Sequence, residues 1–255
     1  MNDRRSSAAI IDLGFQSCSG LQTYSGLQTY SGHPSLRSIG RYSLLEWTIK
    51  RLANSSLLDA IVITGSAFYA ECIEALGIEP ARWIPSEARN PLERCIHVAK
   101  VVQANWIVLV QNNCPFIDPI LVDRLVAAAW ATPNSDLISF VSSSRPTASL
   151  RGLGLVAEVC RRRALRRLAA RIDADDQRDV SQLIHSMPEL FHARCLPLPA
   201  ALDREGLRWA LETEDDWDKA HMLLDSQSDT IDYSELANMA IHCDTNRLHV
   251  ARRAR

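Results

Sequence analysis

The chain has 255 residues, of which 47% are hydrophobic and 23% charged, enough apolar sequence to bury the core of one large α/β domain. Its formal net charge of −2 and pI near 6.4 argue against a general attraction to nucleic acid or to an anionic membrane. The apolar runs are too short to cross a bilayer, and the stretch before Gly14 lacks a signal-peptide core. We therefore expect a cytoplasmic protein without nucleic-acid or membrane partners, in which local groups hold any anionic ligand.

Short apolar runs alternate with helical patterns along most of the chain. Parallel neighbouring strands need helical crossovers, so this alternation predicts a three-layer α/β/α fold with a mostly parallel sheet. We expect residues 1–244 to form one domain, followed by a flexible basic tail at 245–255. The expected strands lie at 8–13, 60–64, 82–85, 106–110, 136–141, 153–160, 191–196 and 207–211, and the expected helices at 44–53, 67–76, 91–103, from 119, 161–171, 180–187, 213–224 and 232–242. Ser43 and Glu46 form a capping-box pattern at the start of the helix at 44–53, and Trp209, which alternates with Arg208 in its strand, is expected in the core.

The stretch 106–123 combines a buried strand, a polar loop and the start of a helix. Asp118 can cap that helix and Pro119 suits its first position. In open α/β sheets, ligands bind at the carboxyl ends of strands, which makes Asn112 and Asn113 candidate ligand-binding residues. A plain polar turn is the alternative interpretation of this pair.

A long loop at 14–34 follows the first expected strand, where α/β sheets often cradle phosphates. Within it the hexapeptide Ser-Gly-Leu-Gln-Thr-Tyr occurs twice in tandem, at 19–24 and 25–30, which we interpret as a local duplication that lengthens the loop. Glycines supply flexibility, yet no Lys or Arg occurs between Arg5 and Arg37. A surface loop without ligand contacts therefore remains the simpler interpretation.

An acidic cluster follows the basic helix expected at 161–171. Asp173 and Asp175 form an Asp-x-Asp pattern, which superficially matches metal-dependent glycosyltransferases. In such enzymes the acids close a strand, whereas here they follow a helix. We therefore treat a metal-dependent glycosyltransferase as a less favoured hypothesis.

Four motifs, in order, resemble the cytidylyltransferase-like nucleotidyltransferases, specifically the spore-coat polysaccharide biosynthesis branch that is related to CMP-sugar synthetases. Residues 36–46 resemble the end of the family's nucleotide loop and its first helix, and 113–119 resemble its Asp-Cys-Pro-Leu-Ile-Asp-Pro motif. Residues 157–159 resemble its Val-Glu-Val strand, and 207–216 its Leu-Arg-x-Thr-Val-Asp-Thr-Pro-Glu-Asp motif. The similarity spans residues 8–240 and implies a nucleotide-diphospho-sugar transferase fold of the Rossmann-like type.

The resemblance also implies a reaction and its partners. A sugar acid or sugar phosphate attacks the α-phosphorus of a nucleoside triphosphate such as CTP, with Mg²⁺ as cofactor, and relatives commonly form a homodimer. The resemblance places the metal at Asn113 and Glu212. It places the nucleotide and substrate contacts at Gly14, Ser17, Gly20, Asn112, Asn113 and Glu158.

The sequence departs from the family pattern where the chemistry is most demanding. Asn113 replaces an aspartate, so a neutral amide stands where a charge would offset Mg²⁺. Glu212 replaces a second aspartate and has a longer arm, and the cationic loop signature is absent. We therefore expect a nucleotidyltransferase-like protein for surface-polysaccharide sugar activation whose activity is weak or lost. The alternative is a non-catalytic homologue, a pseudoenzyme that binds a nucleotide or sugar or serves as a scaffold.

Overall fold

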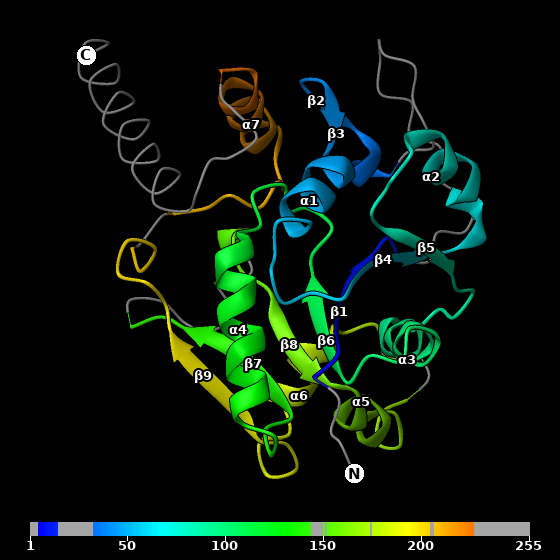
Figure 1. The fold of residues 1–255 in the computed structure, drawn as a ribbon, viewed down its shortest axis with the longest axis vertical. Coiled ribbons are helices and arrows are strands. Elements are labelled where there is room, and N and C mark those ends of the chain that lie inside the picture. The colour runs from blue at the N-terminus through cyan, green and yellow to red at the C-terminus, as the bar shows by residue number, and fades with distance from the viewer. Residues whose placement is uncertain are drawn as a thin grey trace.

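The computed structural model of the protein describes residues 5–14, 33–143, 150, 152–173, 175–204 and 207–226. Its centre is a seven-stranded sheet with the order β5-β4-β1-β6-β8-β7-β9 (Figure 1). Only β8 runs antiparallel to its neighbours β6 and β7 among these strands, so the predicted mostly parallel sheet is confirmed. The strands are β1 (Ser7–Asp12), β4 (Ala60–Gly65), β5 (Arg82–Pro85), β6 (Trp106–Val110), β7 (Leu137–Val141), β8 (Glu158–Arg161) and β9 (Ala193–Pro197).

Helices cover both faces of this sheet, which makes the three layers expected from the sequence. Strand β1 shows how: Ala9 and Ile11 pack into one buried cluster, and Ala8 and Ile10 into the other, because successive side chains of a strand point to opposite faces. The first cluster receives buried side chains from α1 (Leu44–Leu52), α2 (Ala70–Leu76), α4 (Pro119–Ala131) and α7 (Glu214–Ser226). The second receives them from α3 (Pro91–Val101), α5 (Arg162–Ala169) and α6 (Val180–His185).

Local signals in the sequence fix the starts of the two helices that frame the later site. At α1, Ser43 Oγ accepts from the Glu46 backbone N–H at 3.2 Å, and the Glu46 carboxylate accepts from Ser43 N at 2.7 Å, which is a capping box. At α4, the buried Asp118 carboxylate accepts from Ile120 N and Leu121 N at 2.9 and 3.0 Å. Both caps were predicted from the sequence. A short hairpin of β2 (Ser38–Ile39) and β3 (Tyr42–Ser43) precedes α1, and the 3-10 turns are Pro34–Leu36 and Ala67–Tyr69.

Two strand predictions were wrong. Of residues 153–160, only the end forms β8, and residues 207–211 do not join the sheet. Instead these two segments lie against each other, with Trp209 N donating to Leu153 O at 3.1 Å. Gly154 permits the approach: its φ is +69°, and a Cβ there would lie 2.3 Å from the Ala210 nitrogen. Trp209 is nevertheless buried, as predicted.

Several expectations fall outside the described residues. They are the duplicated hexapeptide, the helix at 232–242 and the tail at 245–255. Within the described ranges, no helix is both long and apolar enough to cross a bilayer.

Candidate functional site

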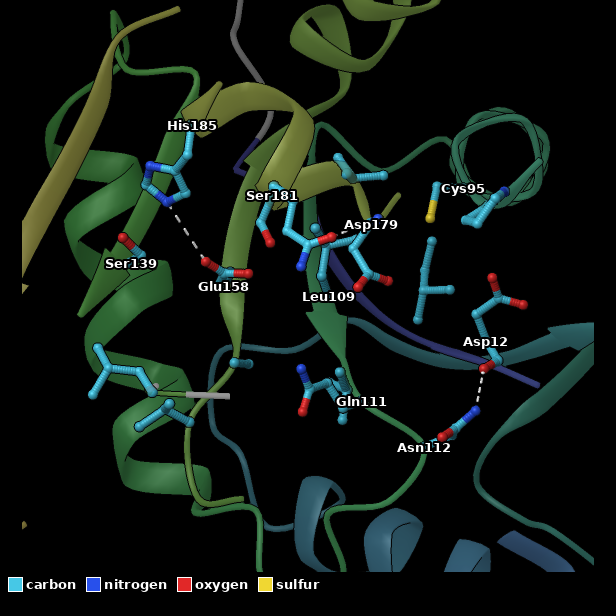
Figure 2. A pocket seen from close by; sticks show the side chains of 18 of the residues that line it. Asp12, Cys95, Leu109, Gln111, Asn112, Ser139, Glu158, Asp179, Ser181 and His185 are labelled. Atoms are coloured by element: carbon cyan, nitrogen blue, oxygen red, sulfur yellow. Dashed lines mark hydrogen bonds and ion pairs between the residues drawn. The ribbon is translucent and has the colours of Figure 1, made fainter. Parts of the chain in front are cut away.

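A cavity of about 1050 Å³ opens where β1 and β6 end and β8 begins, with α6 along one wall (Figure 2). This is the edge of the sheet at which α/β proteins bind ligands. Five residues singled out from the sequence line it together: Gly14, Asn112, Asn113, Glu158 and Glu212. Ser17 and Gly20 lie outside the described residues.

One side of the cavity, formed by the ends of β1 and α3, holds a tight ion pair. Arg94 Nε donates to both carboxylate oxygens of Asp12 at 2.8 and 2.9 Å, and its side chain is only 4% exposed. Arg94 Nη1 also donates to the carbonyls of Ala88 and Arg89 at 2.7 and 2.8 Å. Gly14 N donates to Asp12 Oδ1 at 2.9 Å. This guanidinium therefore serves the fold and is poorly placed to bind a phosphate.

The loop after β6 is tied to three other segments. Asn112 Nδ2 donates to the Asp12 carbonyl at 2.8 Å, as Figure 2 shows, and Ser35 Oγ donates to the Asn112 carbonyl at 2.8 Å. Leu211 N donates to the Asn113 carbonyl at 2.9 Å. The last bond brings the segment that carries Glu212 beside Asn113, the juxtaposition that the sequence motifs imply.

Asp216 organises the turn that presents Glu212. Its Oδ2 accepts from Glu212 N, Thr213 N and Thr213 Oγ1 at 3.1, 2.9 and 2.8 Å. Arg208 Nη2 donates to Asp216 Oδ2 at 3.0 Å and to Glu212 Oε2 at 2.9 Å. Burial alone would raise the pKa of Asp216, but these hydrogen bonds outweigh it and lower the pKa. Glu212 is thus well positioned, and Arg208 already neutralises its charge.

The opposite side of the cavity, formed by β8 and α6, holds groups that the sequence did not single out. His185 Nε2 lies 3.8 Å from Glu158 Oε1, Ser139 and Ser181 lie near this pair, and Asp179 lies beyond Ser181 toward Leu109 and Cys95 (Figure 2). Asp12 and Arg94 on the other side were missed as well. Asp12 ends the first predicted strand and could have been found by that position, whereas nothing in the sequence signals that His185 on α6 faces Glu158.

Burial disfavours the charged forms of two titratable side chains near the cavity. Burial lowers the pKa of His33, although a hydrogen bond to the Leu13 backbone and the nearby Asp12 carboxylate act in the opposite direction. Its Nδ1 accepts from Ser35 N at 3.1 Å, which caps the turn that enters β2. Burial raises the pKa of the Cys95 thiol, so this residue of the cavity wall is not a thiolate nucleophile.

The residues present do not fit a tightly held Mg²⁺. Asn113 contributes a neutral amide, with the Cys114 thiol 3.3 Å from its Oδ1, and the Glu212 carboxylate is paired with Arg208. Among the described residues, no group of three or more His, Cys, Asp or Glu side chains could hold a metal ion. Asp173 and Asp175 are exposed in the turns after α5 and do not line the cavity.

The fold is shared with solved nucleotidyltransferases. One is a cytidylyltransferase from Leptospira borgpetersenii serovar Hardjo-bovis (TM-score 0.75, 15% identity, 94% of both chains). A CMP:2-keto-3-deoxy-manno-octonic acid synthetase complexed with CTP is also similar (TM-score 0.59, 12% identity, 87% of this chain and 99% of that chain). So is a Mycobacterium tuberculosis H37Rv protein complexed with manganese (TM-score 0.56, 16% identity, 85% and 97%). At these identities the similarity shows the Rossmann-like fold.

The sequence match then gives the family. Residues 35–187 match the cytidylyltransferase family, and the chain belongs to it. A mitochondrial 3-deoxy-manno-octulosonate cytidylyltransferase from Arabidopsis thaliana is 28% identical over 116 residues, 44% of this chain and 39% of that protein. The chain thus spans about two fifths of the curated relative that it matches.

Proposed function

We propose that this chain is a nucleotidyltransferase-like protein of the CMP-sugar synthetase type. In this proposal the cavity binds a cytidine nucleotide and a sugar, in support of surface-polysaccharide biosynthesis, while cytidylyl transfer is weak or lost. Family membership and the meeting of Gly14, Asn112, Asn113, Glu158 and Glu212 around one cavity support the binding half of the proposal.

The charge of the cavity supports the loss of activity, and this observation carries the proposal. Transfer to the α-phosphorus of CTP needs cationic groups on the triphosphate and a metal ion on the developing negative charge. Among the described lining residues, Arg94 is the one Lys or Arg side chain, and it is already paired with Asp12. The acidic side chains that line the cavity are Asp12, Glu158, Asp179 and Glu212, of which Asp12 and Glu212 are paired with Arg94 and Arg208. The described lining therefore offers a triphosphate no Lys or Arg side chain that is not already paired.

The alternative is a homologue that has become purely a scaffold for a partner enzyme and binds no nucleotide. Calorimetric titration separates the two proposals, with cytidine as the uncharged ligand, CMP as the ligand with one phosphate and CTP as the most highly charged one. Under our proposal CMP and cytidine bind, CTP binds no better than CMP even with Mg²⁺, and a pyrophosphate-release assay over a sugar panel shows little or no turnover. If none of the three ligands binds, the scaffold alternative is supported and our proposal is refuted.

The variant Asn113→Asp tests whether the metal site decayed at this residue. It adds a carboxylate beside Glu212, so we expect the apparent affinity for Mg²⁺ to rise about tenfold or less, because Arg208 still pairs with Glu212. The matched control is Asn134→Asp, an exposed residue after α4 that does not line the cavity. Equal Mg²⁺ affinity in both variants would contradict the placement of the metal at Asn113.

A further inference from the structure

The side chains on the β8–α6 side of the cavity indicate which class of sugar this site would favour. Glu158 lies on β8 and His185 on the last turn of α6, and Figure 2 shows their side chains directed toward each other at the cavity wall. We propose that this pair binds a hydroxyl or amino group of a sugar without a carboxylate, and that the protein selects a neutral or amino sugar over a sugar acid. This inference rests on the proposed function, whose sugar-binding half it makes specific.

The geometry of the pair leaves room for a ligand atom. The His185 Nε2 to Glu158 Oε1 distance of 3.8 Å is longer than a direct hydrogen bond. An oxygen or nitrogen about 2.8 Å from both atoms fits this separation, accepting from one and donating to the other, which is the pattern that a sugar hydroxyl offers. The two side chains are 33% and 25% exposed, so the fold does not bury them against each other.

The surroundings of the pair favour a ligand rich in hydrogen-bonding groups. Ser139 and Ser181 contribute hydroxyls to the same wall, and Gln182 contributes an amide whose oxygen accepts from Asp179 N at 3.3 Å. Hydroxyls and amides can each donate and accept, as the successive hydroxyls of a sugar ring require. The pair is therefore one part of a polar wall large enough for a sugar in a cavity of about 1050 Å³.

Charge decides against a sugar acid. A carboxylate placed between Glu158 and Asp179 would meet two like charges, and the described β8–α6 wall offers no Lys or Arg to pair with it, only His185, which already faces Glu158. Removing a carboxylate from water without a cationic partner is costly, and a like charge nearby raises that cost. An ammonium group in the same place gains a carboxylate partner, and a neutral hydroxyl incurs neither cost.

Saturation-transfer NMR on the full chain tests this selection with D-glucosamine, D-glucose and D-glucuronate, which share a ring configuration and differ in one group. We expect glucosamine to bind best, glucose next and glucuronate at least tenfold more weakly than glucosamine. In Glu158→Gln, which keeps the shape of the side chain but removes its charge, the advantage of glucosamine over glucose should disappear. The matched control is Glu74→Gln on the exposed face of α2, which should keep the wild-type order.

The possible outcomes distinguish failure of the sugar inference from failure of the proposed function. Glucuronate binding as tightly as glucosamine, or an unchanged order in Glu158→Gln with unchanged thermal unfolding, would overturn the inference. CMP binding without binding of any of the three sugars would also overturn it and would leave nucleotide binding intact. The predicted sugar order in a protein that binds neither CMP nor cytidine would support the inference and refute the nucleotide half of the proposed function.

Discussion

The two sides of the cavity each carry a pair of oppositely charged or chargeable side chains, and the two pairs are built differently. Arg94 and Asp12 lie 2.8 Å apart, with the guanidinium 4% exposed and further bonded to two backbone carbonyls. His185 and Glu158 lie 3.8 Å apart and remain a quarter to a third exposed. The first pair is buried and bonded into the fold, and the second is loosely spaced and partly open to solvent.

Within one cavity, the charges of the buried pair are thus used by the fold, and those of the exposed pair are not. A buried guanidinium whose Nε and Nη1 donate to Asp12, Ala88 and Arg89 holds residues 88 and 89 against the end of β1 and is poorly placed to bind a triphosphate. A loosely spaced, partly exposed pair contributes little to folding, because exposed ion pairs are worth only about 0 to 1 kcal/mol. Substitutions on the two sides should therefore change different measured quantities.

Replacing Arg94 with Met should have the largest effect on stability. It removes a buried charge that pairs with Asp12 and leaves the carbonyls of Ala88 and Arg89 without this donor. Breaking a buried pair costs about 3 to 5 kcal/mol, and because Asp12 is 21% exposed we expect about 2 to 4 kcal/mol in urea unfolding.

The double variant Arg94→Met with Asp12→Asn controls for the charge that is left behind. It should recover part of the loss, because the remaining partner no longer carries an unpaired charge. A double variant that is as unstable as the sum of the two single variants would show that the pair is not coupled as the geometry indicates.

His33 should give a smaller effect, visible in the pH dependence of stability. The pKa of His33 in the folded state lies below the unfolded value of 6.5. As the pH falls, the unfolded chain therefore binds more protons than the folded chain does. The stability that neutral His33 contributes is therefore complete above pH 6.5. It is lost as the pH falls below this value, at no more than about 1.4 kcal/mol per pH unit for one proton.

The variant His33→Asn isolates that contribution. Asn can still accept the hydrogen bond from Ser35 N that caps the turn, but it does not titrate. Chemical unfolding between pH 5 and 8 should show a shallower decline toward acid pH in this variant. An identical pH profile would mean that groups other than His33 set the slope.

Replacing His185 with Ala should have the smallest effect on stability, about 0.5 kcal/mol or less. The 3.8 Å contact with Glu158 is partly exposed, and solvent weakens it further. Urea unfolding measures this value beside that of Arg94→Met. A loss above about 2 kcal/mol would show that the β8–α6 pair is structural, and the contrast between the two sides would then fail.

The sequence predicted the frame of the site better than its lining. Asp118 and the Ser43 to Glu46 capping box were found because capping depends on neighbours within three residues, which periodicity and residue type reveal. The buried strands β4 and β6 were found for a similar reason, as short apolar runs with polar ends.

Contacts between distant segments were not visible in the sequence. The pairing of Asp12 with Arg94 joins residues 82 positions apart, and that of Glu158 with His185 depends on how α6 packs after the acidic turns. The segment 207–211 alternates like a strand, yet it lies against residues 152–154 instead of joining the sheet. Tertiary packing overrode local pattern there.

Gly154 lies where the segment before β8 packs against the segment that leads to Glu212. The backbone that leads to Glu212 crosses directly over it, and the chain that follows it enters β8 at Glu158. A side chain at this position would push both segments apart and shift two acidic residues of the wall at once. The absence of a Cβ at residue 154 thus couples the positions of Glu158 and Glu212, so a substitution there should reshape the cavity although this residue does not line it.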